Sequence, residues 1–384
     1  TGSSTFAVAA APGEGCWEYY TGPCMHHSIA AYYGSGNWTG DVCTGPEVTL
    51  AGLSAGSPLF AGIKTQDNFL MDCSKSNNPS GIISEGIVGM AYQELISGFD
   101  GVPLFDSVVQ ATGIPNIFSM QCCGWQGGKA AGGQLVLGGV DSSLYTGEFQ
   151  YTPITRHAWF CVNLVEAYVD GSELPPPMPA PVCPETFPVV PCFLFPCGVS
   201  NAQCSGGLCQ CPAGSCFANS QDGLWDCVSM QEPFKPFARL HQLGALQSGE
   251  SEEAREKLGQ APQDCNAIID SGTSEIVLGK EDYHTVITQL QTVADEVEGG
   301  AQCVRESMLT YFPDVIIHLE GDVKLSVPAT TYFQPRPDDS GCYVLFIGRG
   351  GAQAIIGQPM MEAYYTVFDK ENDRIGFAPI AGCS

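Results

Sequence analysis

Basic residues are scarce in this chain of 384 residues, where 15 Lys and Arg stand against 41 Asp and Glu, so the formal net charge is −26. An acidic surface repels phosphate backbones, which excludes nucleic acid as the main partner. Charged residues make up only 15% of the chain, whereas hydrophobic residues make up 44%. That balance supplies enough apolar surface for a folded core and excludes a disordered polyanion.

Long apolar runs are also missing. The longest candidate, residues 189–199, is interrupted by Pro191 and Pro196, and it falls short of the roughly 20 apolar residues that a membrane helix needs. We therefore expect these residues to be soluble, although a membrane anchor after Ser384 stays open. The length suits two medium domains or the two lobes of one enzyme.

Histidine is scarce as well. The chain has six, and even the adjacent His26 and His27 lack the spacing of metal ligands. We therefore expect neither a metal site nor a cofactor. No order of Ser, His and Asp indicates a serine hydrolase either.

Cysteine, by contrast, is abundant, with 19 in the chain. Such usage is typical of an oxidising compartment, so we expect the secretory or endomembrane lumen or the extracellular space. Because 19 is odd, at least one thiol has no partner within the chain. The first residue is Thr1 rather than Met, which favours a processed protein or a fragment.

The chain divides into two β-rich lobes and an insertion. Residues 1–165 form the expected N-terminal lobe, with strand-like runs such as 134–137 between Gly-rich turns. Residues 166–384 form the expected C-terminal lobe, and the β pattern in it resumes at Asn266 and continues to the end. Five prolines open an insertion over 175–262 that interrupts the second lobe.

The insertion itself has two parts. Eight cysteines lie in the segment 183–227, a density typical of a small module stapled by disulfides. Zinc binding is the competing interpretation, which the absence of a nearby His pair disfavours. Residues 231–262 follow as a charged linker that we expect to be helical around 250–257.

A short pattern occurs once in each lobe. Gly2, in Thr-Gly-Ser-Ser, stands 87 residues before Gly89 of an Ile-Val-Gly run (89 − 2 = 87). Gly272, in Asp-Ser-Gly-Thr, stands 85 residues before Gly357 of an Ile-Ile-Gly run (357 − 272 = 85). An internal duplication explains this recurrence economically.

The second copy of the pattern has catalytic potential. Asp270 follows the apolar run 267–269 and enters a turn at Gly272, where the backbone can bend tightly. Two such turns brought face to face would juxtapose two carboxylates, and like charges about 3 Å apart cannot both ionise, so they share a proton. The ionised carboxylate can then deprotonate water while the protonated one polarises a carbonyl group.

These features resemble the pepsin-like aspartic protease family (peptidase A1), and within it the β-secretase (memapsin) branch most. Further matching runs are Glu-Gly-Ile-Val-Gly-Met-Ala-Tyr at 85–92, Pro-Asn-Ile-Phe-Ser at 115–119 and Arg-Ile-Gly-Phe at 374–377. The resemblance covers nearly the whole chain except 175–262. It implies an all-β, bilobal fold with the Cys-rich insertion in the C-terminal lobe, a flap near 29–40, and an aspartic-type endopeptidase (EC 3.4.23 type) acting as a monomer on peptide or protein substrates.

The resemblance also implies roles for individual residues. Asp270 matches the second catalytic aspartate, Tyr33 the flap tyrosine and Trp38 its hydrogen-bonding partner. The remaining matches are the loop-supporting residues Thr1, Gly2, Ser3, Ser271 and Gly272, and the substrate-contacting residues Thr273 and Ser274.

One part of the family pattern is missing. The first catalytic aspartate should stand directly before Thr1, outside the chain, so we expect this polypeptide to be inactive alone and the full-length form to be active. The alternative is a catalytically inactive protein that keeps the cleft for binding and uses its disulfide-rich module for recognition.

The resemblance implies three disulfides. Two pair Cys123 with Cys383 and Cys303 with Cys342. The third joins Cys265 to a cysteine beyond the end of the chain, which would account for the odd thiol.

Overall fold

The computed structural model describes 17 segments, and within them strands predominate over helices, as expected for an all-β fold. The described residues are 6–8, 10–13, 16–18, 23–32, 36–45, 47–67, 86–96, 99–126, 129–130, 132–171, 203–205, 208–210, 215–219, 225–229, 265–297, 304–336 and 341–383.

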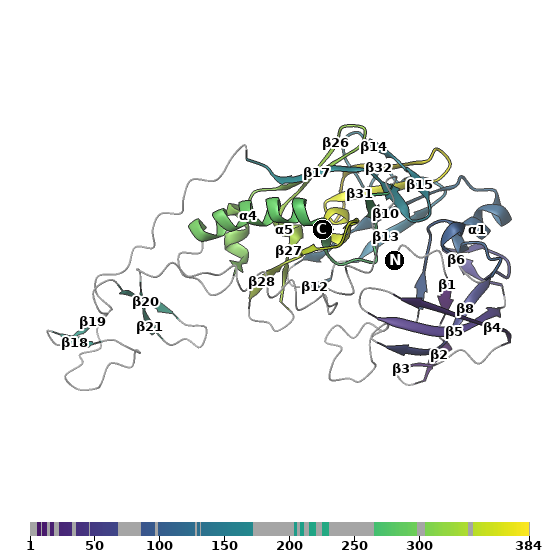
Figure 1. The fold of residues 1–384 in the computed structure, drawn as a ribbon, viewed down its shortest axis with the longest axis horizontal. Coiled ribbons are helices and arrows are strands. Elements are labelled where there is room, and N and C mark those ends of the chain that lie inside the picture. Colours follow the sequence, from purple (N-terminus) through teal and green to yellow (C-terminus); the bar gives the residue numbers. More distant parts are fainter. Residues whose placement is uncertain are drawn as a thin grey trace.

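The first half of the chain forms a five-stranded sheet, which lies at the lower right of Figure 1. Its strands, in spatial order, are β4 (Cys24–Tyr32), β5 (Asn37–Thr44), β8 (Leu59–Asp67), β1 (Phe6–Val8) and β9 (Gly86–Val88). Strands β4 and β5 are antiparallel neighbours joined by residues 33–36, so a hairpin stands where the flap was expected. Two small hairpins accompany the sheet: β2 (Ala10–Gly13) with β3 (Cys16–Glu18), and β6 (Thr49–Leu50) with β7 (Leu53–Ser54).

Residues 156–169 and the second half of the chain together form a six-stranded sheet and two smaller ones. The six strands, in spatial order, are β15 (Arg156–His157), β16 (Phe160–Val162), β22 (Ala267–Ile269), β30 (Ala354–Ile356), β23 (Ile276–Leu278) and β29 (Ile347–Arg349). One smaller sheet orders β17 (Leu164–Val169), β25 (Val315–Leu319) and β26 (Val323–Val327); the other orders β24 (Val304–Arg305), β28 (Cys342–Leu345) and β27 (Phe333–Pro335).

A central five-stranded sheet joins the two halves (Figure 1). Its order is β13 (Gly133–Leu137), β10 (Ile117–Cys122), β31 (Tyr364–Asp369), β32 (Arg374–Pro379) and β14 (Gln150–Pro153). The carboxyl-terminal hairpin β31–β32 thus lies between strands of the first half. Phe118 stacks on Phe368 across this junction with ring centroids 4.7 Å apart, so apolar packing reinforces the backbone pairing. A short hairpin, β11 (Trp125–Gln126) with β12 (Lys129–Ala130), adjoins it in sequence.

The two halves repeat the same strand register. In each half, a strand that begins four residues after the first Gly of the pattern pairs antiparallel with the strand that ends directly before the second Gly. The matching pairs are Phe6–Val88 and Ala7–Ile87 in the first half, and Ile276–Ile356 and Val277–Ile355 in the second. Phe6 stands as far after Gly2 as Ile276 stands after Gly272, since 6 − 2 and 276 − 272 are both 4. The strand register therefore confirms the internal duplication.

Helices are few but one of them is long. The described helices are α1 (Leu104–Thr112), α4 (Lys280–Val297), α5 (Ala329–Tyr332), α6 (Gln358–Met361) and the 3-10 turns η1 (Gln93–Leu95) and η2 (Glu306–Tyr311). The β-rich pattern expected from Asn266 to the end is present, but the long helix α4 interrupts it. Its buried residues Val286, Leu290 and Val293 recur at helical spacing, so one face packs on the core. Among the described helices, none combines the length and apolarity that crossing a membrane requires.

Two hairpins are described within the Cys-rich segment. They pair β18 (Gln203–Ser205) with β19 (Leu208–Gln210), and β20 (Ser215–Asn219) with β21 (Trp225–Ser229). In Figure 1 they lie at the far left, apart from the sheets. The linker expected to be helical, 231–262, is outside the described residues.

Disulfides tie distant parts of the chain together. One joins Cys123 to Cys383, the pair that the family resemblance implies. Cys342 is also disulfide-bonded, while Cys303 lies outside the described residues.

The expectation for Cys265 is wrong, because Cys265 pairs with Cys161 inside the chain. The two cysteines meet because β16, which carries Cys161, is the sheet neighbour of β22, which begins two residues after Cys265. The odd cysteine count therefore does not come from Cys265. Among the described cysteines, Cys122 carries a free thiol.

Candidate active site

Asp270 is delivered by a fully buried strand. The three residues of β22 are all buried, and β22 is flanked by β16 on one side and by the parallel strand β30 on the other. Asp270 itself is 9% exposed. Its backbone N–H donates to the carbonyl oxygen of Ile356 at 3.1 Å, which fixes the point where the chain leaves the sheet.

Both carboxylate oxygens of Asp270 are held by its own turn. Oδ1 accepts a hydrogen bond from the backbone N–H of Gly272 at 3.0 Å, and Oδ2 accepts one from the hydroxyl of Thr273 at 2.8 Å. The backbone N–H of Thr273 also donates to the carbonyl of Asp270 at 3.2 Å. Donors from two directions orient the carboxylate, as a group positioned for acid–base chemistry requires.

The turn is approached closely by Gly357, the second Gly of the pattern, which directly follows β30. A Cβ placed on Gly357 would lie 2.2 Å from the carbonyl oxygen of Glu275 and 2.3 Å from that of Thr273, so only glycine fits there. The next residue, Gln358, donates its backbone N–H to Thr273 at 2.9 Å. Strand β30 therefore lies between β22 and β23, and the two residues that follow it pack against the turn that holds Asp270.

The expected site residues fall into three groups. Asp270, Ser271, Gly272, Thr273 and Ser274 share this one turn, in which Gly272 and Ser274 are exposed and Ser271 and Thr273 are half-buried. Trp38 lies on β5, far along the sequence, where it is 1% exposed and packs against Ala61 and Ile63. Thr1, Gly2, Ser3 and Tyr33 are outside the described residues.

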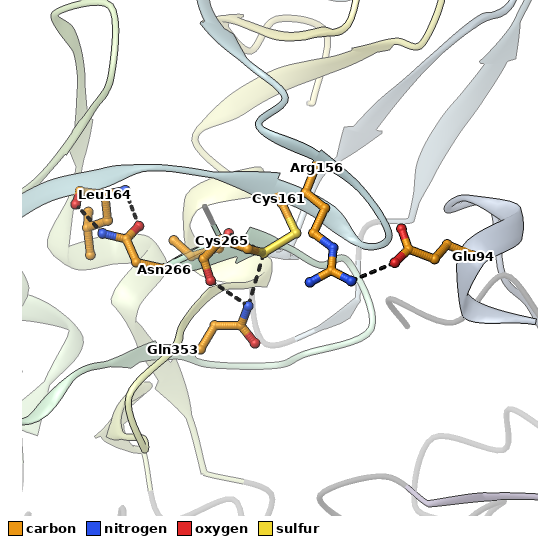
Figure 2. The surroundings of a disulfide bond; sticks show 8 residues. Glu94, Arg156, Cys161, Leu164, Cys265, Asn266 and Gln353 are labelled. Atoms are coloured by element: carbon orange, nitrogen blue, oxygen red, sulfur yellow. Dashed lines mark hydrogen bonds and ion pairs between the residues drawn. A yellow bond between two sulfur atoms is a disulfide. The ribbon is translucent and has the colours of Figure 1, made fainter. Parts of the chain in front are cut away.

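The base of β22 has anchors that the sequence did not indicate (Figure 2). Beside the Cys161–Cys265 disulfide, the side chain of Gln353 donates to the carbonyl oxygen of Cys265 at 2.8 Å. The side chain of Asn266 both accepts from the backbone N–H of Leu164, at 2.8 Å, and donates to its carbonyl, at 2.9 Å. These contacts hold the strand that positions Asp270.

These anchors join segments far apart in sequence, so no local pattern could have revealed them. The spacing of Cys161 and Cys265 was the single available signal, because both flank apolar strands and enclose the insertion. Within the part of the chain that the structure describes, no cluster of three or more His, Cys, Asp or Glu side chains is arranged to hold a metal ion.

Comparisons with known proteins agree with this architecture. The family described as "Eukaryotic aspartyl protease" matches residues 24–189 and 248–380. Cathepsin D of the dog (Canis lupus familiaris) is 25% identical over 380 residues, covering 94% of this chain and 70% of that protein. Pepsin A of the pig (Sus scrofa) is 22% identical over 361 residues, covering 92% of this chain and 66% of that protein. Renin of the viper Echis ocellatus is 22% identical over 301 residues, covering 77% and 53%.

The mostly β structure with its repeated strand framework agrees with the bilobal, pepsin-like fold. The chain belongs to the eukaryotic, pepsin-like aspartyl protease family, because the matched residues span most of its length. It spans from about half to 70% of the length of the relatives named here.

Proposed function

We propose that the full-length protein is an aspartic endopeptidase that hydrolyses peptide bonds with a pair of carboxylates. The observation that carries this proposal is the position of Asp270, oriented by Gly272 and Thr273 in a turn whose strand framework is repeated in the first half. In the repeat, the residue equivalent to Asp270 falls directly before Thr1, and we infer that it is an aspartate.

The proposed chemistry uses water and no cofactor. The ionised carboxylate of the pair takes a proton from a water molecule, whose oxygen attacks the carbonyl carbon of the peptide bond. The protonated carboxylate gives its proton to the carbonyl oxygen, so a tetrahedral diol forms. The carboxyl group that was protonated by the water then gives its proton to the amide nitrogen, while the other carboxylate takes a proton from one hydroxyl of the diol. The carbon–nitrogen bond breaks, a carboxylic acid and an amine leave, and the two carboxylates again share one proton.

Other residues would position the substrate. Gly272 and Ser274 are exposed beside Asp270, and with Thr273 they offer backbone and hydroxyl groups to an extended peptide. Thr1, Gly2, Ser3 and Ser271 would link the two turns. Tyr33 would cover the substrate from the hairpin β4–β5, and Trp38 would hold that hairpin against the sheet.

Finer proposals concern the setting of the enzyme. We propose the β-secretase branch of the family, a monomer, and a secretory or endomembrane compartment. The cysteine content and the disulfides support an oxidising location. Sequencing the complete transcript tests the branch and the compartment, since it shows which residues precede Thr1 and whether a membrane anchor follows Ser384; the sedimentation rate of the full-length protein tests the monomer.

The decisive experiment uses the protein extended to its natural amino terminus. We expect cleavage of an unstructured peptide at acidic pH and tight binding of a pepstatin-type inhibitor. Asp270→Asn should abolish cleavage, while Asp322→Asn, whose side chain is 82% exposed, should leave cleavage unchanged. A residue other than Asp before Thr1, together with no cleavage, would instead support the inactive, cleft-bearing binding protein.

A further inference from the structure

The hairpin β4–β5 is built differently at its base and at its tip. This inference rests on the proposed function, in which the hairpin is the flap over the cleft. We call Cys24–Ser28 with Gly40–Thr44 the flap base, and Ile29–Tyr32 with Asn37–Thr39 the flap tip.

A disulfide closes the flap base. Cys24 and Cys43 are directly opposite each other in the two strands and are bonded to one another. Cys43 is fully buried. Because the bond crosses between adjacent strands, β4 and β5 cannot separate at this end of the hairpin.

A buried carboxylate ties the same end to the rest of the sheet. Asp41 on β5 is 5% exposed. Its Oδ1 accepts a hydrogen bond from the hydroxyl of Ser28 on β4 at 3.0 Å, and its Oδ2 pairs with the ammonium of Lys64 on β8. One side chain therefore connects three adjacent strands.

The carboxylate of Asp41 is held in its charged form. The hydrogen bond from Lys64 keeps the pKa of Asp41 below its ordinary value, against the opposing effect of burial, and Ser28 and the nearby His26 act in the same direction as Lys64. The contacts of Asp41 therefore persist in mildly acidic solution.

The pairing of β5 with β8 is interrupted between Thr39 and Gly40, where the flap base meets the flap tip. Thr39 pairs with Thr65, whereas the next residue, Gly40, pairs with Ile63, so Lys64 is an extra residue in β8. Such a bulge bends a strand and breaks the regular ladder. A Cβ at Gly40 would lie 2.2 Å from the carbonyl oxygen of Gly62, so the close approach at this bend requires glycine.

The tip is held by apolar packing and one hydroxyl–hydroxyl hydrogen bond rather than by a disulfide or an ion pair. Trp38 is buried against Ala61 and Ile63 of β8, and the half-buried Ile29 and Ala31 pack against the same cluster. The hydroxyl of Thr39 bonds to that of Thr65 on β8, while Tyr32 at the outer end is 79% exposed. The tip is therefore held to the sheet by contacts that can separate without breaking a covalent bond or an ion pair.

We propose that the Cys24–Cys43 disulfide and Asp41 are positioning groups that clamp the flap base to the sheet, so that flap opening is confined to the tip beyond the bulge at Gly40 and Lys64. A clamped base leaves fewer conformations to be lost when the flap closes on a substrate. The clamp therefore lowers the KM for a peptide rather than accelerating the chemical step.

Hydrogen exchange on the full-length protein tests the clamp without relying on cleavage. In the unmodified protein, the amides of Gly40–Thr44 in the flap base should exchange at least roughly tenfold more slowly than those of Asn37–Thr39 in the tip. Asp41→Asn and the double variant Cys24→Ala/Cys43→Ala should each accelerate exchange at the base by roughly tenfold, because each removes one tie. Equal exchange of base and tip in the unmodified protein would overturn the proposal.

Matched controls separate the clamp from general destabilisation. Glu94→Gln removes another carboxylate–cation pair, with Arg156, and Cys123→Ala/Cys383→Ala removes another disulfide. Neither should change exchange at the flap base. Acceleration by the controls equal to that by Asp41→Asn would contradict a local role.

Kinetics give the second readout. In folded, active protein, Asp41→Asn should raise the KM of a long peptide roughly three- to tenfold and change kcat by less than about twofold. An unchanged KM, or a loss confined to kcat, would contradict the positioning role. If cleavage is absent altogether while exchange differs between base and tip as described, the proposed function fails and the clamp stands.

Discussion

Gly357 lies so close to Thr273 that a Cβ on the glycine would stand 2.3 Å from the carbonyl oxygen of the threonine. This contact brings the second strand of the repeat under the turn that holds Asp270. It explains why the pattern in the second half ends in glycine, and it makes the turn sensitive to a single added methyl group.

Gly357→Ala should therefore damage the turn. We expect a loss of about 1–3 kcal/mol in the free energy of unfolding, because a buried backbone must shift to admit the methyl group, and a marked loss of cleavage in the full-length enzyme. Gly171→Ala is the control, since nothing lies within 4 Å of its Cβ position. Urea unfolding of both variants checks this; equal stabilities would show that the backbone adapts without cost.

The Cys161–Cys265 disulfide should be a major source of stability. It closes a loop with a sequence separation of 104 residues, and this loop contains the entire expected insertion 175–262. Replacing both cysteines with Ala should lower the free energy of unfolding by roughly 2–4 kcal/mol, mainly because the unfolded chain without the bond gains conformational entropy. Thermal unfolding measures the effect, and an unchanged midpoint would argue that the sheet and Asn266 alone hold β22.

Stability should rise on acidification because of Glu362. Burial raises the pKa of this carboxyl group from its ordinary value of 4.5 to about 7. The charged form is thus disfavoured in the folded state, so the destabilisation is present above about pH 7 and is relieved as the pH falls towards the unfolded value. The side chain is only partly buried, so we expect less than the ~3 kcal/mol that the full shift would carry.

Glu362→Gln should flatten this pH dependence, while Glu371→Gln, at an exposed position, should preserve it. Unfolding measured at about pH 5 and about pH 8 distinguishes the two. The same slope in Glu362→Gln and in the unmodified protein would rule out this carboxyl group as its source.

The stability of the protein should depend strongly on the ion pair between the buried Lys370 and Asp106. The Lys370 side chain is 2% exposed, and its ammonium lies 2.5 Å from Oδ1 of Asp106 and 4.8 Å from the centre of the Tyr92 ring. Burial lowers the pKa of Lys370, and Asp106 opposes this. Asp106→Ala would leave the charge buried and unpaired, so we expect a loss of about 3–5 kcal/mol in the free energy of unfolding.

The double variant Lys370→Met/Asp106→Leu should recover much of that loss, because no uncompensated charge remains. Lys324→Met, at an exposed pair with Asp322, should change stability by no more than about 0.5 kcal/mol. A double-mutant cycle checks the expectation. Additive losses for Lys370 and Asp106 would mean that the two side chains are not coupled.

Some features could be predicted from sequence because their signals are local or repeated. The strands that end before Asp270 and at Leu137 carry continuous apolar runs, and the matched spacing of the glycines predicted the duplication that the strand register confirms. Helix α4 carried an equally local signal in the spacing of Val286, Leu290 and Val293. The expectation of a β-rich pattern from Asn266 onward did not single out this helix.

Other features had no local signal. Cys265 was expected to pair outside the chain, yet β16 brings Cys161 to it. Asp41 and Lys370 look like ordinary charged residues in the sequence, but the fold buries both and provides their partners. Such pairings depend on which strands become neighbours, which spacing along the chain does not specify.

The sequence by itself determined the family, and its repeated pattern singled out Asp270. These conclusions follow from composition and from short-range sequence patterns, which can be recognised without knowing which residues are in contact. Only the tertiary structure decided that Gly357 supports the turn of Asp270, that Cys161 bonds to Cys265, and that Asp41 clamps the hairpin. Each of these is a contact between segments far apart in sequence, and burial and strand order create it.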